Sequence, residues 1–440
     1  MEPVTEAAWP LALKLYAFGM DALAPFAPYF LKRRQQRGKE DPERFRERLG
    51  FPSLKRPDGP LIWIHAASIG EAVAMLPLID ALKARFEATL LITTGTVTSA
   101  RVMRDRLPEG VLHQFVPLDM PVAVNRFLDH WQPDATLFAE SEIWPATVKA
   151  LDARDIPFAI VNGRMSAKST RGWLRAPLVA KALIGRFAVI AAQSAHDAEH
   201  FATLGAENVV TTGNLKFEVE PPPVDKDKLA LARIAIAGRE VWAALSLHPG
   251  EDETVLNAHH AIREAHPDCL LFLVPRHPER AAMMAEKARS LGLRTALRSE
   301  TQVPRTDTDV FIFDTLGEIG IVTALAPVAL MGGTLIEHGG QNPIEPIRAG
   351  TVVLHGPSTS NFREVFDSLT DAEGIFAVTN AEDLAEIVSS LLKDEEHRAA
   401  VAVKAKAVIE GMRGASARTL EALAPVFAHA RLQQRPASAD

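Results

Sequence analysis

Cysteine is almost missing from this sequence, because Cys269 is the only one in 440 residues. A single thiol cannot form an internal disulfide, which is typical of proteins in a reducing compartment. Cys269 opens the apolar run 269–274, so we expect it in a hydrophobic core. The net charge is −7, so there is no overall positive field, and this disfavours a nucleic-acid-binding protein.

Several motifs that would indicate other enzyme classes are also missing. There is no HExxH or CxxC motif of the kind that binds a metal ion. No glycine-rich loop ends in Gly-Lys-Ser/Thr, and no GxGxxG follows the first apolar run of either half. These absences argue against a kinase and against a simple dehydrogenase, and they predict no metal ion and no cofactor.

The N-terminal segment is unusually apolar between Ala7 and Leu31, and the basic run 32–39 follows it. An apolar stretch of about 20 residues can span a bilayer, and basic residues next to it favour anionic headgroups on the cytoplasmic side. Lys14, Asp21 and three prolines weaken a spanning helix. We expect residues 1–35 to anchor the protein by spanning the membrane or lying in its surface. The alternative is a helix packed on the domain.

Beyond residue 60, short apolar runs alternate with helical patterns such as 71–86. The runs do not alternate apolar with polar residues, which is typical of parallel strands buried on both faces. In the first half they are 61–66, 90–94, 113–118, 135–139, 158–161, 187–192 and 209–212. In the second half they are 241–247, 270–274, 310–313, 327–331, 352–354 and 375–378.

This organisation predicts an α/β fold with two doubly wound, Rossmann-like domains that face a cleft. The three prolines at 221–223 predict a stiff connector between them. The expected segments are an N-terminal membrane anchor (1–35), a first domain (36–218), a linker (219–228), a second domain (229–428) and a flexible tail (429–440). Ligands should bind at the carboxyl ends of the strands, where helices begin.

Two acidic motifs follow runs of the first half. After 61–66, Gly70 permits a tight turn and Glu71 opens a helix whose dipole favours its ionised form. Such a carboxylate can accept a proton from an attacking hydroxyl, although a capping glutamate is the commoner explanation of this pattern. After 135–139, an extended segment would place Glu140 and Glu142 on one side, beside the stacking face of Trp144. Sugar binding and helix capping explain this second motif equally well.

Basic and glycine-rich motifs follow other runs. Arg164 lies in the motif 162–166, and the basic stretch that follows it (Lys168, Arg171, Arg175 and Lys181) can bind a phosphorylated acceptor or form a solvated surface. In the second half, Arg276 is placed to grip a phosphate. The pair Gly332 and Gly333 allows backbone N–H groups to approach a phosphate ester. Further along, Asn342 is expected to cap a helix that starts at Pro343, and Glu345, one turn in, is expected to reach a ribose or sugar hydroxyl.

Taken in order, these loops resemble those of the Kdo (3-deoxy-D-manno-octulosonic acid) transferases. The similarity starts near Arg33 and continues to the end of the second domain. It rests on the blocks 65–71, 140–145, 162–166, 212–217, 276–280, 314–318 and 339–346, together with 37–40 and 47–50. The number and order of the blocks argue against an accidental similarity.

The resemblance implies a GT-B glycosyltransferase, with the acceptor-binding domain first and the CMP-sugar-binding domain second. The donor would be CMP-Kdo and the acceptor a lipid A precursor (lipid IVA) in lipopolysaccharide core synthesis. The transfer would be inverting and metal-independent, at the cytoplasmic face of the inner membrane. Glu71 would be the general base. The donor would be bound by Arg276, His277, Pro278, Gly332, Gly333, Thr334, Asn342 and Glu345, and the acceptor by Ser68, Gly70, Glu140, Glu142 and Arg164.

Three positions depart from the family pattern. Thr334 stands where Ser is frequent, Gln341 where His is frequent, and Ala146 where Asn is frequent. They lie beside the expected sites and leave details of sugar contact open. Two alternatives remain from the sequence: another GT-B enzyme or an epimerase that uses a UDP-sugar, and a non-catalytic membrane-associated binding protein. A binding protein would have no need of the Glu71 carboxylate.

Overall fold

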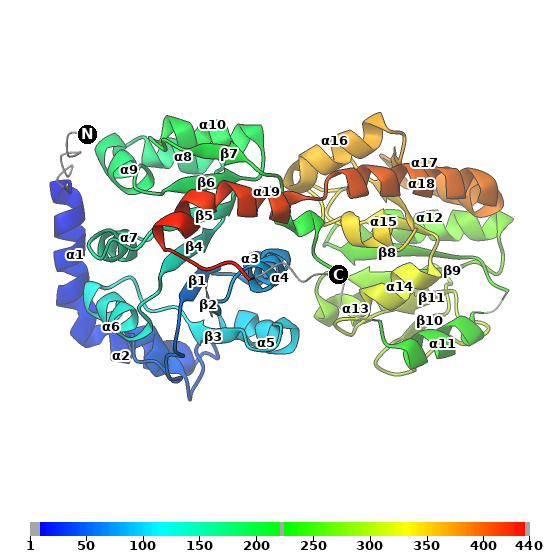
Figure 1. Cartoon of the computed structure of the whole chain (residues 1–440). Coiled ribbons are helices and arrows are strands. Elements are labelled where there is room, and N and C mark those ends of the chain that lie inside the picture. The colour runs from blue at the N-terminus through cyan, green and yellow to red at the C-terminus, as the bar shows by residue number, and fades with distance from the viewer. Residues whose placement is uncertain (1–8, 221–223, 237, 436–440) are drawn as a thin grey trace. The chain divides into compact units, whose positions relative to one another are not determined.

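The computed structural model describes residues 9–220, 224–236 and 238–435. The chain forms two compact units (Figure 1). One contains Met1–Val219 together with Arg413–Asp440, and the other contains Glu220–Met412. The second unit therefore ends at Met412, and not at residue 428 as predicted from the sequence.

The first unit is built on seven parallel strands in the order β3-β2-β1-β4-β5-β6-β7. All seven apolar runs of the first half form these strands. Alternate residues of β1 enter two separate cores, with Ile62 and Ile64 in one and Leu61 and Trp63 in the other, so both faces of the sheet are covered. The strands are β1 (Leu61–His65), β2 (Thr89–Thr94), β3 (Leu112–Phe115), β4 (Ala135–Ala139), β5 (Phe158–Gly163), β6 (Val189–Ala192) and β7 (Val209–Thr211).

The helices between these strands follow the predicted pattern with one break. The helix expected over 71–86 is two helices that meet at Met75, because Pro77 has no amide hydrogen and fits only the first turn of a new helix. The helices are α3 (Ile69–Ala74), α4 (Leu76–Arg85), α5 (Val97–Arg106), α6 (Pro121–Trp131), α7 (Pro145–Asp152), α8 (Ala167–Trp173), α9 (Pro177–Ile184) and α10 (Ala195–Thr203), with the 3₁₀ turns η2 (Phe45–Leu49) and η3 (Leu215–Phe217).

The N-terminal segment forms α1 (Leu11–Leu23), η1 (Ala24–Phe26) and α2 (Ala27–Gln35). Within residues 9–220, 224–236 and 238–435, no helix is both long enough and apolar enough to cross a bilayer. The anchor expected over 1–35 is therefore not present as a spanning helix in this range, and residues 1–8 lie outside it. Instead, α1 packs on α6 and α7 (Figure 1), and the Tyr16 hydroxyl donates to Asp119 Oδ2 at 2.9 Å.

The C-terminal helices α19 (Ala415–Ala422) and α20 (Ala424–His429) belong to the first unit. Phe427 of α20, together with Leu423 between the two helices, completes the core that contains Leu82 of α4. This burial explains why the chain returns to the first unit. Part of the expected tail is also ordered, since residues 433–435 make backbone hydrogen bonds to residues 85–87. Residues 436–440 lie outside the described ranges.

The second unit repeats the scheme with seven parallel strands in the order β10-β11-β9-β8-β12-β13-β14. Six of them match predicted runs. The seventh, β10, was missed because its three residues are only half-buried at the sheet edge. The strands are β8 (Val241–Leu247), β9 (Leu270–Pro275), β10 (Thr295–Leu297), β11 (Val310–Ile312), β12 (Val328–Met331), β13 (Val352–His355) and β14 (Ile375–Ala377).

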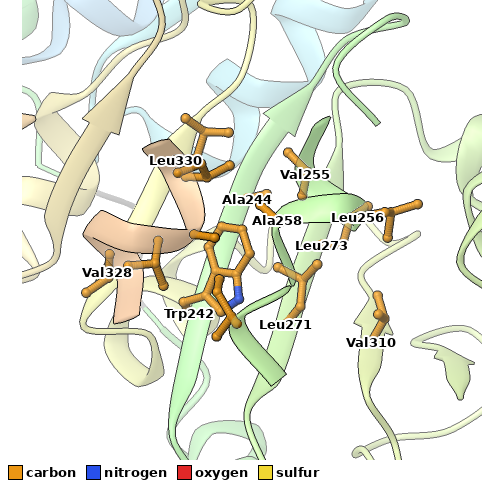
Figure 2. Close-up of a cluster of buried hydrophobic side chains, with 14 of the residues drawn as sticks. Trp242, Ala244, Val255, Leu256, Ala258, Leu271, Leu273, Val310, Val328 and Leu330 are labelled. Atoms are coloured by element: carbon orange, nitrogen blue, oxygen red, sulfur yellow. The ribbon is translucent and has the colours of Figure 1, made fainter. Parts of the chain in front are cut away.

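Figure 2 shows the core of this unit, a cluster that includes Trp242 of β8, Leu271 of β9 and Leu330 of β12. Cys269 is 1% exposed in the same cluster, as expected, and burial raises the pKa of its thiol to about 12. The helices of the unit are α11 (Lys226–Ala235), α12 (Asp252–Ala265), η4 (Pro278–Arg280), α13 (Ala281–Ser290), α14 (Ile319–Leu325), α15 (Ile344–Arg348), η5 (Ser360–Phe362), α16 (Arg363–Asp371), α17 (Ala381–Lys393) and α18 (Glu395–Gly411).

Candidate active site

The strands that carry the acidic motifs are neighbours in the first sheet. β1 lies between β2 and β4, so the strand order reverses at β1. In doubly wound sheets, ligands bind outside the carboxyl ends of the strands at this switch point. Glu71 follows β1, and Glu140 and Glu142 follow β4. The fold therefore brings three of the predicted residues to the position where such sheets bind ligands.

Glu71 is held by the turn that begins α3. Its Oε1 accepts a hydrogen bond from the Ser68 hydroxyl at 2.6 Å, and its Oε2 accepts from the backbone N–H of Ala67 at 2.9 Å. The Glu71 N–H donates to the Ser68 hydroxyl oxygen at 3.3 Å. Ser68 is therefore the N-cap of α3, and Glu71 accepts from the N–H one residue before it, so the capping function considered from the sequence is present. Gly70 lies within the helix without a positive φ, so the tight turn expected there does not depend on glycine.

The electrostatic environment of Glu71 goes beyond capping. Burial raises the pKa of its carboxyl above the usual value, and the nearby charges of Glu142 and Glu140 raise it further. The hydrogen bonds from Ser68 and Ala67 act in the opposite direction. A carboxylate whose pKa is raised in this way is a stronger base than an exposed glutamate, and such groups cluster at catalytic sites.

The extended segment expected for Glu140 and Glu142 is not present. Glu140 has a φ of 52°, in the left-handed region, and starts a turn after β4. Its Oε1 forms an ion pair with Lys216 Nζ at 2.8 Å. Glu142 instead accepts a hydrogen bond from the indole of Trp144 at 2.7 Å. The two carboxylates therefore have different partners, and Glu142 fixes the ring that was proposed as a stacking face.

Two functional candidates at this site had no role assigned from the sequence. Lys216 neutralises Glu140, and His65 is completely buried below Glu142. The Nδ1 of His65 lies 3.0 Å from the Thr93 hydroxyl, and its Nε2, 3.6 Å from Glu142 Oε2, has no hydrogen-bond partner. A histidine inside an otherwise apolar run is the sequence signal that marks such a residue.

Arg164 follows β5 and is exposed. In the part of the chain that the structure describes, no hydrogen bond or ion pair connects its side chain to the three carboxylates. The residue that the structure does fix there is Asn162, which is fully buried and has a φ of 52°. Its Oδ1 accepts from the Leu215 N–H at 2.9 Å and so positions the segment that carries Lys216.

The second unit has its own switch point between β8 and β12. The predicted glycine-rich turn follows β12, but a residue after β8 determines its structure. The carboxylate of Glu251 is fully buried and accepts four backbone hydrogen bonds. Its Oε2 accepts from the N–H groups of His248 at 2.8 Å and Gly333 at 2.7 Å. Its Oε1 accepts from those of Thr334 and Leu335, both at 3.1 Å.

This arrangement corrects the role expected for the glycine pair. The N–H groups of Gly333 and Thr334 are occupied by Glu251, and the Gly332 N–H donates to the Leu245 carbonyl at 2.7 Å. They are therefore not free to hold a phosphate. Gly332 is required for packing instead, because a Cβ there would lie 2.3 Å from the Ser246 carbonyl oxygen. The Thr334 side chain is also fully buried and donates to the Met331 carbonyl.

Polar side chains of differing exposure gather beside this turn. The rings of His248 and His338 stack with their centroids 3.8 Å apart, and the Gln341 amide nitrogen lies 3.0 Å from His248 Nε2. Burial, His338 and the charges of Arg276 and His277 lower the pKa of His248 to about 4, so His248 is neutral at pH 7. Arg276 and His277 are exposed. The structure thus brings both near His248, just before Pro278 starts η4.

Asn342 and Glu345 lie on the segment that leads into α15. Asn342 is exposed, and its Oδ1 accepts from the Ile344 N–H at 3.1 Å, so the helix begins one residue later than expected. Glu345 lines a pocket of about 250 Å³ together with Lys228 and Glu318. The carboxyl of Glu318 forms ion pairs with Lys228 at 3.1 Å and Arg298 at 2.8 Å.

No group of three or more histidine, cysteine, aspartate or glutamate side chains is placed to hold a metal ion within the described ranges. Two segments have the Asp-x-Asp spacing, 225–227 and 307–309. Asp225 caps α11 through the N–H groups of residues 227 and 228. Asp309 is paired with Arg294 at 2.7 Å. One aspartate of each segment, Asp225 and Asp309, therefore has a structural partner.

Comparison with known proteins separates the possible enzyme families. The family model described as 3-deoxy-D-manno-octulosonic-acid transferase (kdotransferase) matches residues 43–219. A probable mitochondrial 3-deoxy-D-manno-octulosonic acid transferase of Arabidopsis thaliana is 36% identical over 87% of this chain and 88% of its own length. The 3-deoxy-D-manno-octulosonic acid transferase of Haemophilus influenzae is 34% identical over 87% of this chain and 91% of its own.

The chain belongs to the 3-deoxy-D-manno-octulosonic acid transferase family. Both the predicted family and the predicted enzyme class, a Kdo glycosyltransferase, are confirmed. A glycosyltransferase structure from Rickettsia africae aligns with a TM-score of 0.57, covering 85% of this chain and 99% of its own, at 12% identity. At that identity the alignment supports the fold alone, which is α/β and GT-B-like.

Proposed function

We propose that this Kdo transferase uses CMP-Kdo as its donor and a lipid A precursor, lipid IVA, as its acceptor in lipopolysaccharide core synthesis. The first unit binds the acceptor and the second binds the donor. The observation that carries the catalytic part of the proposal is the half-buried Glu71 carboxylate, held by Ser68 and Ala67 at the switch point of the first sheet.

Glu71 acts as the general base in an inverting, metal-independent transfer. Its carboxylate takes the proton of the acceptor hydroxyl while that oxygen bonds to the anomeric carbon of Kdo. The bond from this carbon to the phosphate oxygen breaks, and CMP leaves with the electron pair. The raised pKa supports this role, because a stronger base takes the proton more readily.

The remaining site residues bind and orient the two substrates. Arg276, exposed beside His248 and His277, carries the positive charge that pairs with the phosphate of CMP. Asn342 and Glu345 contribute to the same donor site. Gly332, Gly333 and Thr334 act indirectly, by shaping the turn that precedes His338 and Gln341. On the acceptor side, Glu140, Glu142 and Arg164 bind sugar hydroxyls or phosphate.

The protein works at the cytoplasmic face of the inner membrane, where the lipid acceptor resides. Support comes from the helices α1 and α2 and the turn η1, whose large apolar side chains are exposed to an unusual extent. Phe18 is 74% exposed, Phe26 67% and Tyr29 72%, and Lys32 and Arg33 follow in the last turn of α2. An apolar face beside basic residues is typical of a segment that lies in the membrane surface.

The test is product analysis by mass spectrometry with purified protein, a lipid A precursor and CMP-Kdo in detergent. A mass gain of one or more Kdo units is expected from the wild type. Glu71→Gln should lower kcat by about 10²–10⁴, the usual contribution of a positioned base. Glu109→Gln is the matched control. Glu109 is exposed and precedes β3, so it lies at the amino ends of the strands, whereas Glu71 follows the carboxyl end of β1.

Two outcomes would contradict the proposal. A Glu71→Gln enzyme that turns over at the wild-type rate would exclude Glu71 as the base. If folded wild-type protein gave no Kdo-containing product, the donor or acceptor would be wrong. Calorimetric titration with cytidine and uridine nucleotides would then decide between a CMP-sugar and the UDP-sugar considered from the sequence.

A further inference from the structure

A groove of about 770 Å³ opens on the first unit, between the N-terminal helices and α6. Its volume is within the range of about 300–1,000 Å³ that small-molecule sites have. Most of its lining is apolar, with Ala24, Pro25 and Pro28 on one side and Leu49, Met120 and Val122 on the other. The transferase chemistry proposed above makes no use of this groove.

The walls of the groove are held together by specific contacts. Gly50, at the end of η2, has a φ of 82° and packs so closely on α6 that a Cβ would lie 2.1 Å from the Ala123 carbonyl oxygen. On the other side, Asp21 Oδ1 accepts from the Val122 N–H at 3.3 Å and joins α1 to the start of α6. The groove is therefore formed before any ligand arrives, which reduces the entropic cost of binding.

The rim of the groove is cationic at one end. Phe51 is 38% exposed, and the guanidinium groups of Arg126 and Arg46 lie 4.6 Å and 5.0 Å from the centre of its ring. A guanidinium that contacts an aromatic face still directs its N–H groups outward. Among the residues that the structure describes, one of these groups, Arg126 Nη1, makes a further hydrogen bond, at 3.4 Å to the Leu49 carbonyl oxygen. Two arginines so placed form a site for a phosphate group.

The surface beside the groove is apolar as well. Leu23, Phe26, Tyr29 and Phe30, on the same helices that form one wall, are between 53% and 72% exposed. Exposed rings and aliphatic side chains next to an apolar groove with a cationic end match the structure of a bilayer lipid, which joins an acyl chain to a phosphate.

We propose that this groove binds one acyl chain of an anionic phospholipid of the bilayer, with the lipid phosphate on Arg46 and Arg126. The ligand is a resident membrane lipid and not the sugar acceptor. The site thus adds a specific lipid contact to the surface attachment, and it does not depend on transferase activity.

The first test is native mass spectrometry of full-length protein released from detergent after incubation with phosphatidylglycerol. The wild type should retain one phosphatidylglycerol per chain. Val122→Trp fills the groove and should reduce that lipid-bound fraction about tenfold or more. Val210→Trp is the matched control, because Val210 is 46% exposed on β7 and the same volume is added outside the groove. Equal lipid retention by the two variants would overturn the proposal.

The charge contribution is tested by competition between phosphatidylglycerol and phosphatidylcholine. Replacing Arg46 and Arg126 together by Gln should reduce the preference for phosphatidylglycerol about tenfold, as expected when charge-assisted hydrogen bonds are lost. The control removes the same charge by replacing Arg101 and Arg104, both exposed on α5. If both double variants lost the preference equally, only net charge would matter and the phosphate site would be wrong.

A labelling experiment on the unmodified protein covers the case in which Val122→Trp does not fold. Phosphatidylglycerol with a photoreactive diazirine in its acyl chain should label residues 120–123, 125 and 126, which line the groove at the start of α6. Label confined to residues 11–20 of α1, which do not line the groove, would mean that lipid contacts only the outer surface. Displacement of the label by the lipid A precursor at equal concentration would show that the groove serves the acceptor, which also contradicts the proposal.

Discussion

The buried carboxylate of Glu251 leads to the strongest stability prediction from this structure. It accepts hydrogen bonds from four backbone N–H groups, at distances of 2.7 to 3.1 Å. In Glu251→Gln, one of the two oxygens becomes an NH₂ group, which is itself a donor. Two of the four N–H groups then face a donor in a fully buried site.

The expected cost follows from those two groups. A buried donor without an acceptor costs about 1–3 kcal/mol, so Glu251→Gln should destabilise the second unit by about 2–6 kcal/mol. Domains are stable by about 5–15 kcal/mol in total. The substitution should therefore remove a large part of the stability of this unit, and Glu251→Ala, which leaves all four donors without an acceptor, should leave it largely unfolded.

Hydrogen exchange measured by mass spectrometry is the appropriate assay, because the chain has two units and a single unfolding midpoint would mix them. Peptides from β8 and β12 should exchange about 30-fold faster or more in Glu251→Gln. Glu253→Gln is the matched control, since Glu253 is exposed in the first turn of α12, the helix that Glu251 precedes. This substitution should change stability by less than about 0.5 kcal/mol. Equal exchange in the two variants would refute the structural role of Glu251.

The other predictions concern catalysis and the donor. Activity should fall as the pH drops through the raised pKa of Glu71, because only the ionised carboxylate is a base. Ser68→Ala removes a hydrogen bond that lowers this pKa and should move the acid limb of kcat/KM to higher pH, whereas Glu142→Gln removes a repelling charge and should move it to lower pH. Shifts of the same sign would contradict the assignment. Arg276→Ala should weaken CMP binding about tenfold or more by calorimetry, while Arg289→Ala, exposed on α13, should not change it.

Most strands could be predicted from the sequence, because the central strands of each sheet are buried on both faces and carry few polar residues that would interrupt an apolar run. The exception was β10, whose three residues are half-buried and so show no such run. The domain boundary was a different kind of error. The helices after residue 412 have ordinary amphipathic patterns, and nothing local in such a pattern shows which of two cores will bury Leu423 and Phe427.

The acidic half of the site was accessible to prediction because its parts are local. The position of Glu71 can be predicted from a strand, a short turn and a helix start that are adjacent in the sequence. Ser68, which holds its carboxylate, is three residues away. The partners of Glu140 and His65 were not accessible in this way. Lys216 lies 76 residues from Glu140, and its contact depends on the packing of the turn after β7 beside β4 and β5.

The glycine-rich turn shows why a local motif can have two opposite meanings. Successive backbone N–H groups form a nest for an anion, and the sequence identifies the nest but not the anion. Here the anion is internal, because Glu251, 82 residues before Gly333, lies in the turn between the neighbouring strand β8 and α12, and its carboxylate occupies the nest. An internal carboxylate fixes the turn permanently, whereas a phosphate would fix it only when the donor is bound. In the donor site proposed above, the charge that meets the phosphate of CMP therefore comes from side chains outside the turn, and Arg276, beside the neutral His248, is an exposed cation in that position.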